Sequence, residues 1–471
     1  MQAEEADRNQ GKEYDPRRYA GLYGARRFKA MAAVLLALLL SVLDYAIANV
    51  ALPTIATDLH SDASRAIWVV NAYQLASLSF VLPLASIGTR IGFGRMYQLG
   101  IALFMVASVF CALSQNMLEL ALARALQGVG GSCIMSVNIA LIRFIYPHRI
   151  LGKGIALNGF FVGLGVSLGP TIGSFILSLA SWNWIFWVNL PLGAVALFLC
   201  WMELPETPHS NVKIDYTGSL LTVLSFATLG IGIDGLMHRE FGIGLSLTFF
   251  SIMSWYCLIR WQKGRQEPIV PLDLLKRRPF FVACAVSYCG FIASNLYIVA
   301  MPFTLSEAFH KNPATIGLLI APWAVGTASM SYVIGHFTDR FSASFLSSLG
   351  LFVTAVGFVL LWSLPLDASN LDIAWRTLLA GGGFGIFQPP NNRAIMVTAP
   401  SGREGGASGM LSVARLGGQT TGALIVAGVF TVFAHPAFIC LGAATLMAVL
   451  GAAMSAGRSF LQGGRSILPA D

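Results

Sequence analysis

The most regular feature of the sequence is a series of long apolar runs separated by short polar segments. Each run has about 20 residues, the length with which an α-helix crosses about 30 Å of hydrocarbon. Helices are required because lipid offers backbone groups no hydrogen-bond partners. The pattern predicts about fourteen membrane-spanning helices. The predicted spans cover residues 29–51, 67–88, 96–114, 117–141, 154–180, 183–202, 216–237, 242–261, 279–303, 314–337, 344–365, 371–398, 407–434 and 436–458.

The composition agrees with a surface that faces lipid. Hydrophobic residues make up 56% of the 471 residues and charged residues only 11%, whereas soluble domains carry about 25% charged residues. The net charge is +8, but the basic residues are spread singly and form no stripe typical of nucleic-acid binding. All seven cysteines lie in apolar runs, where a thiol packs as a small hydrophobic group. The composition argues against a soluble enzyme, a nucleic-acid partner and disulfides.

Lysine and arginine are distributed unevenly between the alternating loops. One set of loops, together with both termini, holds most of them, while the other set holds only Arg65, Arg239 and Lys311, with Arg376 at a span edge. Because cytoplasmic loops carry the excess of basic residues, both termini are predicted to be cytoplasmic.

Asp44 lies in the block Asp44–Pro53 of the first span, which also contains the polar Asn49. Ionisable residues within membrane helices are costly and by default functional. Asp44 is therefore a candidate proton or cation site. The alternative is a structural aspartate that is bonded to a neighbouring span.

Arg124 opens a block in the fourth span that ends in Gly128, Gly130 and Gly131. A guanidinium does not deprotonate in proteins, so Arg124 must find a partner inside the bundle. It is a candidate for coupling proton and substrate movements. The alternative is a salt bridge that only packs helices.

The fifth span carries small residues at helical spacing together with a proline. Glycines let helices approach closely, and proline removes a backbone hydrogen bond. A kinked, tightly packed helix suits a pivot between two states, although plain small-residue packing is the alternative. The pivot candidates are Gly159, Gly163, Gly169, Pro170 and Gly173.

Two short basic turns, one in each half of the chain, resemble each other, as expected of transporters built from related bundles. They predict a cytoplasmic latch between helix ends, with an ordinary basic loop as the alternative. The latch candidates are Gly88, Arg90, Gly92, Arg95, Asp339 and Arg340. Spans 7 and 8 lie between the halves as an inserted pair.

Several further residues are candidates to line a substrate cavity. Aromatic rings can stack on flat cations, and the stretch 388–392 is interpreted as an unwound polar patch, as in the discontinuous helices that border transport paths. The cavity candidates are Asn49, Tyr73, Tyr297, Trp323, Phe384, Gln388, Asn391 and the buried cation Arg415.

Other chemistries lack their motifs in this sequence. No GxxxxGK[ST] phosphate loop and no GxSxG elbow occurs, and no histidine, cysteine or acidic cluster has metal-ligand spacing. No metal, no ATP and no cofactor is expected; the energy source would be a proton gradient.

These motifs, with Trp182, Trp184, Phe186, Asn189 and Pro191 after the fifth span, resemble the signatures of the major facilitator superfamily. The nearest branch is that of the fourteen-span drug:proton antiporters, bacterial multidrug and quaternary-ammonium exporters of the inner membrane. The resemblance implies alternating access, proton binding at Asp44, coupling through Arg124 and an antiporter motif at Gly159–Gly173. It departs at Thr89, where the family usually has an aspartate in the latch. Span 10 has Trp323 and no acid, unlike relatives that export dications.

The resemblance also implies a division of the chain around two six-helix bundles. The implied parts are a cytoplasmic arm (1–28), an N-terminal bundle (29–202), a linker with two inserted helices (203–278), a C-terminal bundle (279–458) and a cytoplasmic tail (459–471).

The sequence therefore predicts an all-α membrane protein that exports small hydrophobic, possibly cationic, compounds in exchange for protons. Export or uptake of an endogenous metabolite is the alternative within transport, and a passive channel is another. A membrane-embedded lipid-modifying enzyme would need clustered acids or histidines at the membrane edge, and the sequence has none.

Overall fold

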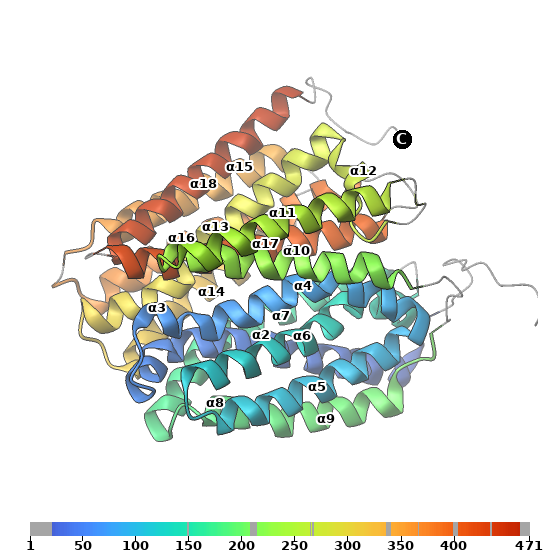
Figure 1. Cartoon of the computed structure of the whole chain (residues 1–471), viewed down its shortest axis with the longest axis horizontal. Helices are drawn as coiled ribbons and strands as arrows, with labels where there is room; N and C mark the ends of the chain where they lie inside the picture. The colour runs from blue at the N-terminus through green and yellow to red at the C-terminus, as the bar shows by residue number, and fades with distance from the viewer. Residues whose placement is uncertain are drawn as a thin grey trace, which may run out of the picture.

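The molecule is an array of long helices that run side by side (Figure 1). The computed structural model describes residues 21–147, 150–207, 214–263, 265, 268–335, 341–365, 367–398, 404–433 and 436–461. The helices are α2 (Gly24–Asp58), α3 (Ala63–Ala66), α4 (Trp68–Ile91), α5 (Phe93–Leu113), α6 (Met117–Ile145), α7 (Leu151–Leu179), α8 (Trp184–Trp187), α9 (Asn189–Glu203), α10 (Tyr216–Met237), α11 (Phe241–Gln262), α12 (Leu272–Leu275), α13 (Arg278–Glu307), α14 (Pro313–Gly335), α15 (Ala343–Trp362), α16 (Asn370–Thr398), α17 (Glu404–Val432) and α18 (Pro436–Leu461).

The prediction of a polytopic helical membrane protein is confirmed. Among the described residues, 13 helical segments are long and apolar enough to cross a membrane. The remaining predicted span, 371–398, is α16, which has 29 residues and contains Pro389 and Pro390. It packs between α14 and α15, so glycines, prolines and asparagines lower its hydropathy without removing it from the bundle.

Two groups of six long helices form the body of the molecule. The N-terminal bundle consists of α2, α4, α5, α6, α7 and α9, and the C-terminal bundle consists of α13 to α18. The bundles meet mainly where α7 packs on α14 and α4 packs on α17, while α2 and α13 touch between these pairs. Figure 1 shows the blue-to-teal bundle below the yellow-to-red one. The contact between bundles is thus made by few helices, which suits movement of one bundle against the other.

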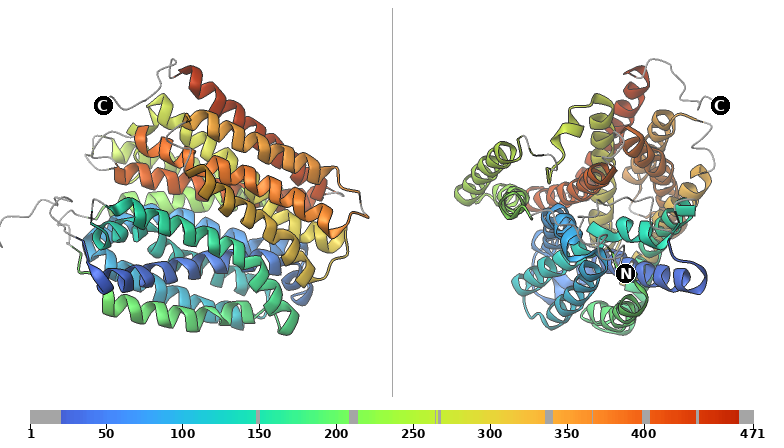
Figure 2. Two further views of the ribbon diagram at one scale, coloured as in Figure 1. Left: turned by 180° about the vertical axis from the view of Figure 1, so that it is seen from behind. Right: turned by 90° about the vertical axis from the view of Figure 1, so that its right-hand side faces the viewer.

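The inserted pair, α10 and α11, lies outside both bundles. The right-hand view of Figure 2 shows this green pair projecting from one side. α10 packs on α4 and α17, where the two bundles meet. His238 Nε2 lies 3.0 Å from Ser64 Oγ of α3, and that hydroxyl donates a hydrogen bond of 2.9 Å to the carbonyl of Ala427 in α17. The pair is therefore bonded to the junction between the bundles.

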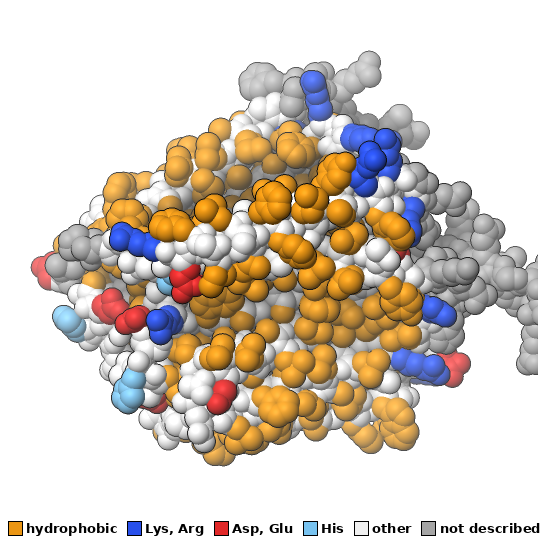
Figure 3. Space-filling view, viewed as in Figure 1, with side chains coloured by type: hydrophobic (Ala, Val, Ile, Leu, Met, Phe, Trp, Pro, Cys, Tyr) orange, Lys and Arg blue, Asp and Glu red, His pale blue; other side chains and the backbone are white. Residues whose placement is uncertain are grey.

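The surface has the distribution of side chains expected of a lipid-facing protein. In Figure 3, apolar side chains cover the middle of the visible face, and charged side chains gather towards its two ends. Large side chains such as Phe249 and Trp201 are 66% and 74% exposed. The end at which α2 begins and α4 ends is called the basic end below, and the end at which α2 finishes is called the opposite end.

Local signals explain several helix boundaries. Asn116 caps α6 by accepting a hydrogen bond from the Glu119 amide at 3.0 Å, and the Glu119 carboxylate accepts one from the Gln115 amide at 2.9 Å. This reciprocal pattern is similar to a capping box, with the carboxylate bonded to the amide of the residue before the N-cap. Gly92 separates α4 from α5 with a φ of +95°, a conformation that glycine adopts without steric cost.

Two sequence interpretations of local structure are wrong. The turn expected over residues 88–95 is almost entirely helical, because Gly92 alone supplies the break between α4 and α5. The stretch 388–392 is not unwound, because α16 continues through both prolines to Thr398. A membrane helix tolerates proline where neighbouring helices satisfy the freed backbone groups.

Candidate functional site

The site is built around the carboxylate of Asp44, which is 2% exposed in the middle third of α2. Arg124 Nη1 of α6 forms an ion pair with its Oδ2. Its Oδ1 accepts hydrogen bonds from Gln127 Nε2 at 2.9 Å and from Asn189 Nδ2 of α9 at 2.6 Å. Ser108 of α5 accepts from the same two amides at 2.8 and 3.2 Å. Both carboxylate oxygens are engaged, so a proton on Asp44 would compete with the ion pair and these hydrogen bonds.

Arg124 is held on several sides and is fully buried. Its Nε donates to the carbonyl of Val69 in α4 at 2.9 Å. The Tyr73 ring lies 4.6 Å and the Phe186 ring 5.7 Å from the guanidinium carbon, within the range of cation–π attraction. Within the described part of the chain, its Nη2 has no hydrogen-bond partner. The predicted candidates Asp44 and Arg124 are thus brought into direct contact, and Tyr73 with them.

The residue next to Asp44 bonds across to the other bundle. Tyr45 donates a hydrogen bond of 2.5 Å to Asn295 Oδ1 of α13 and accepts one of 2.9 Å from Gln74 Nε2 of α4. Asn295 Nδ2 in turn donates to the carbonyl of Gln419 in α17 at 2.5 Å. One turn of α2 therefore carries both the buried carboxylate and a bond between the bundles.

The glycines of α7 play different parts. A Cβ on Gly169 would lie 2.2 Å from Ala46 Cβ of α2, and one on Gly173 would lie 3.1 Å from Ile47. Gly163 faces Ala328 of α14, whereas Gly159 has nothing within 4 Å. Close approach is therefore required only at the end of the motif that packs on α2. Pro170, the remaining pivot candidate, lies inside the uninterrupted helix α7.

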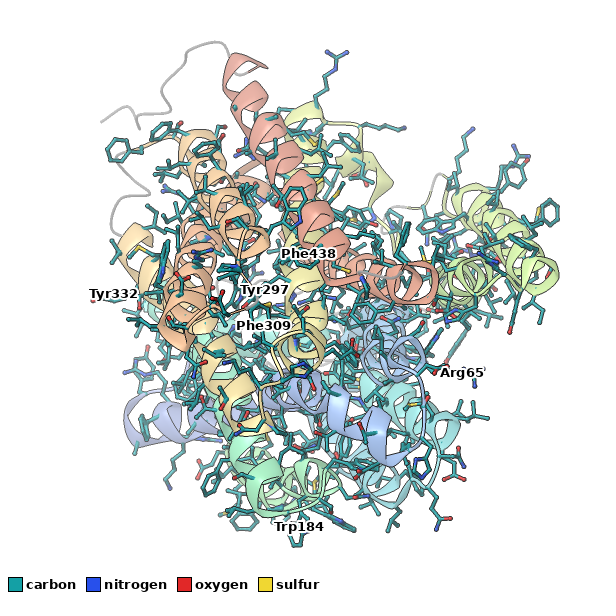
Figure 4. All side chains as sticks on the ribbon, turned by 90° about the vertical axis from the view of Figure 1, so that its left-hand side faces the viewer. Arg65, Trp184, Tyr297, Phe309, Tyr332 and Phe438 are labelled. Atoms are coloured by element: carbon teal, nitrogen blue, oxygen red, sulfur yellow. The ribbon has the colours of Figure 1, made fainter. Side chains whose placement is uncertain are left out.

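The C-terminal bundle contains an aromatic stack in place of a polar cage. The ring of Trp323 in α14 lies 4.8 Å from Tyr297 and 5.8 Å from Phe358, both stacked. Phe384 of α16 packs at 5.7 Å from the same indole. In the end-on view of Figure 4, Tyr297 lies among the helices of this bundle, while Tyr332 lies at its outer edge.

Two cavities lie along the contact between the bundles. A cavity of about 470 Å³ at the opposite end is lined by the last turns of α2 and α13 and the first turn of α14, with the carboxylates of Asp58 and Glu307 in its wall. A small cavity of about 30 Å³ lies deeper and includes Tyr45, Asn49 and Trp323 in its lining. Of the predicted cavity residues, Asn49 and Trp323 line this inner space, and Pro170 joins them.

The remaining candidates lie elsewhere. Asn391 is fully buried, donates to the Ala283 carbonyl at 3.0 Å and accepts from Arg458 Nη1 at 3.2 Å. It thus ties α16 to α13 and α18, while Gln388 is only half-buried. Arg415 of α17 reaches Met135 of α6, with 3.9 Å between Nη2 and the sulfur.

Four of the six latch candidates lie in the described part of the chain. Asp339 and Arg340 lie outside the described residues. Gly88 is buried in the last turn of α4, where an added Cβ would lie 2.7 Å from Val137 of α6. Arg90 and Arg95 are exposed on either side of Gly92, which forms the turn.

Sequence reasoning missed the amide and hydroxyl groups that complete the cage. Gln127 follows Arg124 by three residues and therefore shares its helix face, and Asn189 opens the apolar helix α9. Tyr45, Gln74 and Asn295 were missed as well, although each is a polar residue in an apolar run. Only the fold brings Gln127 and Asn189 to Asp44, and Gln74 and Asn295 to Tyr45. Among the described residues, no group of three or more His, Cys, Asp or Glu side chains could hold a metal ion.

Comparison of the sequence with known proteins identifies the family of this chain. The model of the Major Facilitator Superfamily matches residues 34–298 and 280–459. The chain belongs to the major facilitator superfamily. It is 40% identical over 444 residues to the "Uncharacterized transporter YebQ" of Escherichia coli (strain K12), covering 92% of this chain and 96% of that protein.

The resemblance to the drug:proton antiporter type is also confirmed. The chain is 25% identical to the "Multidrug export protein EmrB" of Haemophilus influenzae, over 86% of this chain and 80% of the relative. It is 26% identical to the "Riboflavin transporter RibZ" of Clostridioides difficile, over 83% and 85% of the two chains. The crystal structure of a D-xylose–proton symporter has the same fold, with a TM-score of 0.69 at 15% identity over 91% of this chain and 97% of that one. This major facilitator is therefore a multi-pass membrane transporter.

Proposed function

We propose that this transporter exports small hydrophobic molecules from a bacterial cytoplasm in exchange for protons. It works by alternating access in the inner membrane, with both termini on the cytoplasmic side. The basic end would then face the cytoplasm, in line with the excess of lysine and arginine there. The cavity of about 470 Å³ would open to the other side.

The observation that carries the proposal is the position of Asp44. Its carboxylate is buried, bound by Arg124, Gln127 and Asn189, and adjacent in sequence to Tyr45, which bonds to Asn295 of the other bundle. Protonation would neutralise the partner of Arg124 and weaken the ion pair. The resulting movement of α2 would act on the bond between the bundles, since both groups sit on one turn of the helix.

The rest of the site supports a hydrophobic cargo. The deeper cavity is walled by Trp323, Ile298 and Ile320 as well as by Tyr45 and Asn49. Small-molecule sites are mostly apolar pockets of about 300–1,000 Å³ with few polar groups, so this space of about 30 Å³ would have to widen when a cargo enters. The energy source would be the proton gradient, without ATP or a cofactor. Binding and release of a proton at Asp44, together with a conformational change, would be sufficient to drive export.

Transport of an endogenous metabolite is the second candidate. The relative named as a riboflavin transporter is 26% identical, close to the 25% of the multidrug exporter. A flat, largely apolar metabolite and a drug would require the same kind of cavity. Accumulation in cells with and without the transporter separates the two: equal retention of every drug tested contradicts multidrug export.

The decisive experiment uses inverted membrane vesicles with proton release recorded while a panel of hydrophobic dyes and drugs is added. We expect Asp44→Asn to abolish proton-driven uptake, because the amide cannot exchange a proton. The matched control is Asp62→Asn, an exposed carboxylate before α3, which should leave uptake unchanged. Undiminished coupling in Asp44→Asn removes this carboxylate from the mechanism.

A further inference from the structure

The two arginines nearest the middle of the bundle contact differ in their partners. Arg124 is paired with Asp44. Among the described residues, the hydrogen-bond partner of Arg415, twelve positions into the 29-residue helix α17, is the sulfur of Met135 at 3.9 Å, and a thioether is a weak acceptor. No carboxylate among the described residues forms a salt bridge with it. Its side chain is half-buried at the contact between the bundles and its guanidinium stays charged, so an anion that binds there would meet a cation that no carboxylate of the described residues already pairs.

Arg415 lies where the two bundles face each other. It extends from α17 of the C-terminal bundle to α6 of the N-terminal bundle, and the nearby groups that interact with it electrostatically are Tyr73 and Tyr45. Both are neutral phenols in which the hydroxyl is a donor and an acceptor. The start of α17 at Glu404 is about 16 Å away along the helix, at about 1.5 Å per residue, which is too far for an ion pair.

The charge in this region is therefore positive. Asp44 and Arg124 cancel each other, and Arg415 adds one unit of positive charge. In a low-dielectric interior, this charge repels a cation and attracts an anion strongly. An arginine also presents a planar fork of donors that matches a carboxylate or sulfonate.

An apolar wall lies on the other side of Tyr45. Tyr45 lines the small inner cavity together with Trp323, whose indole is stacked on Tyr297 and Phe358. When the bundles move and this space of about 30 Å³ widens, a ligand with a ring and an acidic group could place the ring towards Trp323 and the acidic group towards Arg415. Asn49 Oδ1 and Gln74 Oε1, two buried acceptors without partners in the described ranges, lie on the same helices as Tyr45 and Tyr73 and favour a cargo with additional polar hydrogens.

We propose that Arg415 selects the charge of the cargo and that the transported molecules are amphipathic organic anions, such as aromatic carboxylates. The proposal rests on the proposed function, because it names the substrate class of that same passage. It replaces the expectation of cationic cargo, because the positive charge of Arg415 would repel a cation. Arg415 binds the acidic group directly, and the arginine of the Asp44 pair takes no part in this contact.

Binding to the purified, detergent-solubilised transporter tests the proposal without a proton gradient. The probes are naphthylacetate, naphthylethylammonium and naphthylethanol, which share one ring system and differ in charge. The native chain should bind naphthylacetate the most tightly. Arg415→Gln should weaken that binding about tenfold to a hundredfold, the effect of losing one charge-assisted contact, and should leave naphthylethanol unchanged.

Three comparisons keep the test specific. Arg415→Lys should retain most of the preference for the anion, because the charge remains, whereas Arg415→Glu should reverse it in favour of naphthylethylammonium. Arg260→Gln, at an exposed arginine of the inserted pair, is the control and should change nothing. Preference of the native chain for the cation, failure to bind the anion, or an unaltered affinity in Arg415→Gln overturns the proposal.

The outcome is separable from that of the proposed function. If Asp44→Asn leaves proton coupling intact while Arg415→Gln abolishes the preference for the anion, the exchange mechanism fails and the charge selection stands. If Asp44→Asn abolishes proton coupling but Arg415→Gln leaves the affinity for the anion unchanged, the exchange mechanism stands and the charge selection fails.

Discussion

The interiors of the two bundles differ in kind. In the N-terminal bundle, Asp44 is enclosed by polar side chains from three other helices, whereas in the C-terminal bundle the corresponding depth is filled by the stacked rings of Tyr297, Trp323 and Phe358. Under the proposed mechanism, the carboxylate that exchanges a proton lies in the N-terminal bundle, while the C-terminal bundle supplies an apolar wall. If the two bundles have separate roles, a substitution in one bundle should change proton exchange or cargo binding without changing the other. Substitutions in each bundle test this.

The largest effect is expected from Arg124→Gln. Removing one partner of a buried ion pair leaves an uncompensated charge and costs about 3–5 kcal/mol, so the unfolding temperature in detergent should fall strongly. The double variant Arg124→Gln/Asp44→Asn should recover most of the lost stability, because the unpaired negative charge of Asp44 is then removed. The control is Lys29→Gln, in a pair with Glu203 at 3.3 Å whose lysine side chain is 59% exposed, where a small change is expected. Equal losses in both variants would contradict the description of a buried, mutually dependent pair.

An intermediate effect is expected from Trp323→Leu in the other half. The variant loses two stacked ring pairs, each of which contributes about 0.5–1.5 kcal/mol, so the free energy of unfolding should fall by about 1–3 kcal/mol. Substrate affinity should also fall, while the number of protons released per substrate should stay constant, since no group of the cage is touched. Trp201→Leu, at a side chain that is 74% exposed, serves as the control. A changed proton ratio in Trp323→Leu would mean that the two halves are not separate in function.

The smallest effect is expected from Tyr45→Phe at the junction of the halves. The variant loses the hydrogen bonds to Asn295 and Gln74 and keeps the ring, so one intramolecular bond of about 0.5–1.5 kcal/mol is removed between the bundles. Spin labels on the last turns of α2 and α13 measure the distance between these helix ends. In Tyr45→Phe, a larger fraction of molecules than in the native chain should have the ends far apart. Asn295→Leu should act on the same bond, so the double variant should differ little from either single one. Additive effects would show that the tyrosine and the asparagine do not act as a pair.

The fold could be predicted well because its signals are local. An apolar run of suitable length must be a helix in lipid, whatever its neighbours, and this is why span 216–237 coincides with α10. Prediction failed where the local signal was ambiguous. The double proline at Pro389 and Pro390 indicated an unwound segment, but neighbouring helices keep α16 intact. Gly88 was assigned to a turn and instead fills a tight contact with α6.

The candidate site could be predicted only in part. Asp44 and Arg124 stand out because a charge in an apolar run is rare and costly. Gln127 and Asn189 give a weaker signal, since neutral amides are common at helix contacts, and their roles depend on which helices meet.

The sequence by itself determined that this chain crosses the membrane many times and which side chains carry charge within it, because the cost of exposing backbone or charge to lipid depends on composition along one helix. Only the tertiary structure decided that Asp44 is paired with Arg124 while Arg415 has no salt bridge within the described part of the chain. Pairing depends on the distance between side chains of different helices, which are 80 residues apart for Asp44 and Arg124, and no pattern along the chain encodes that distance.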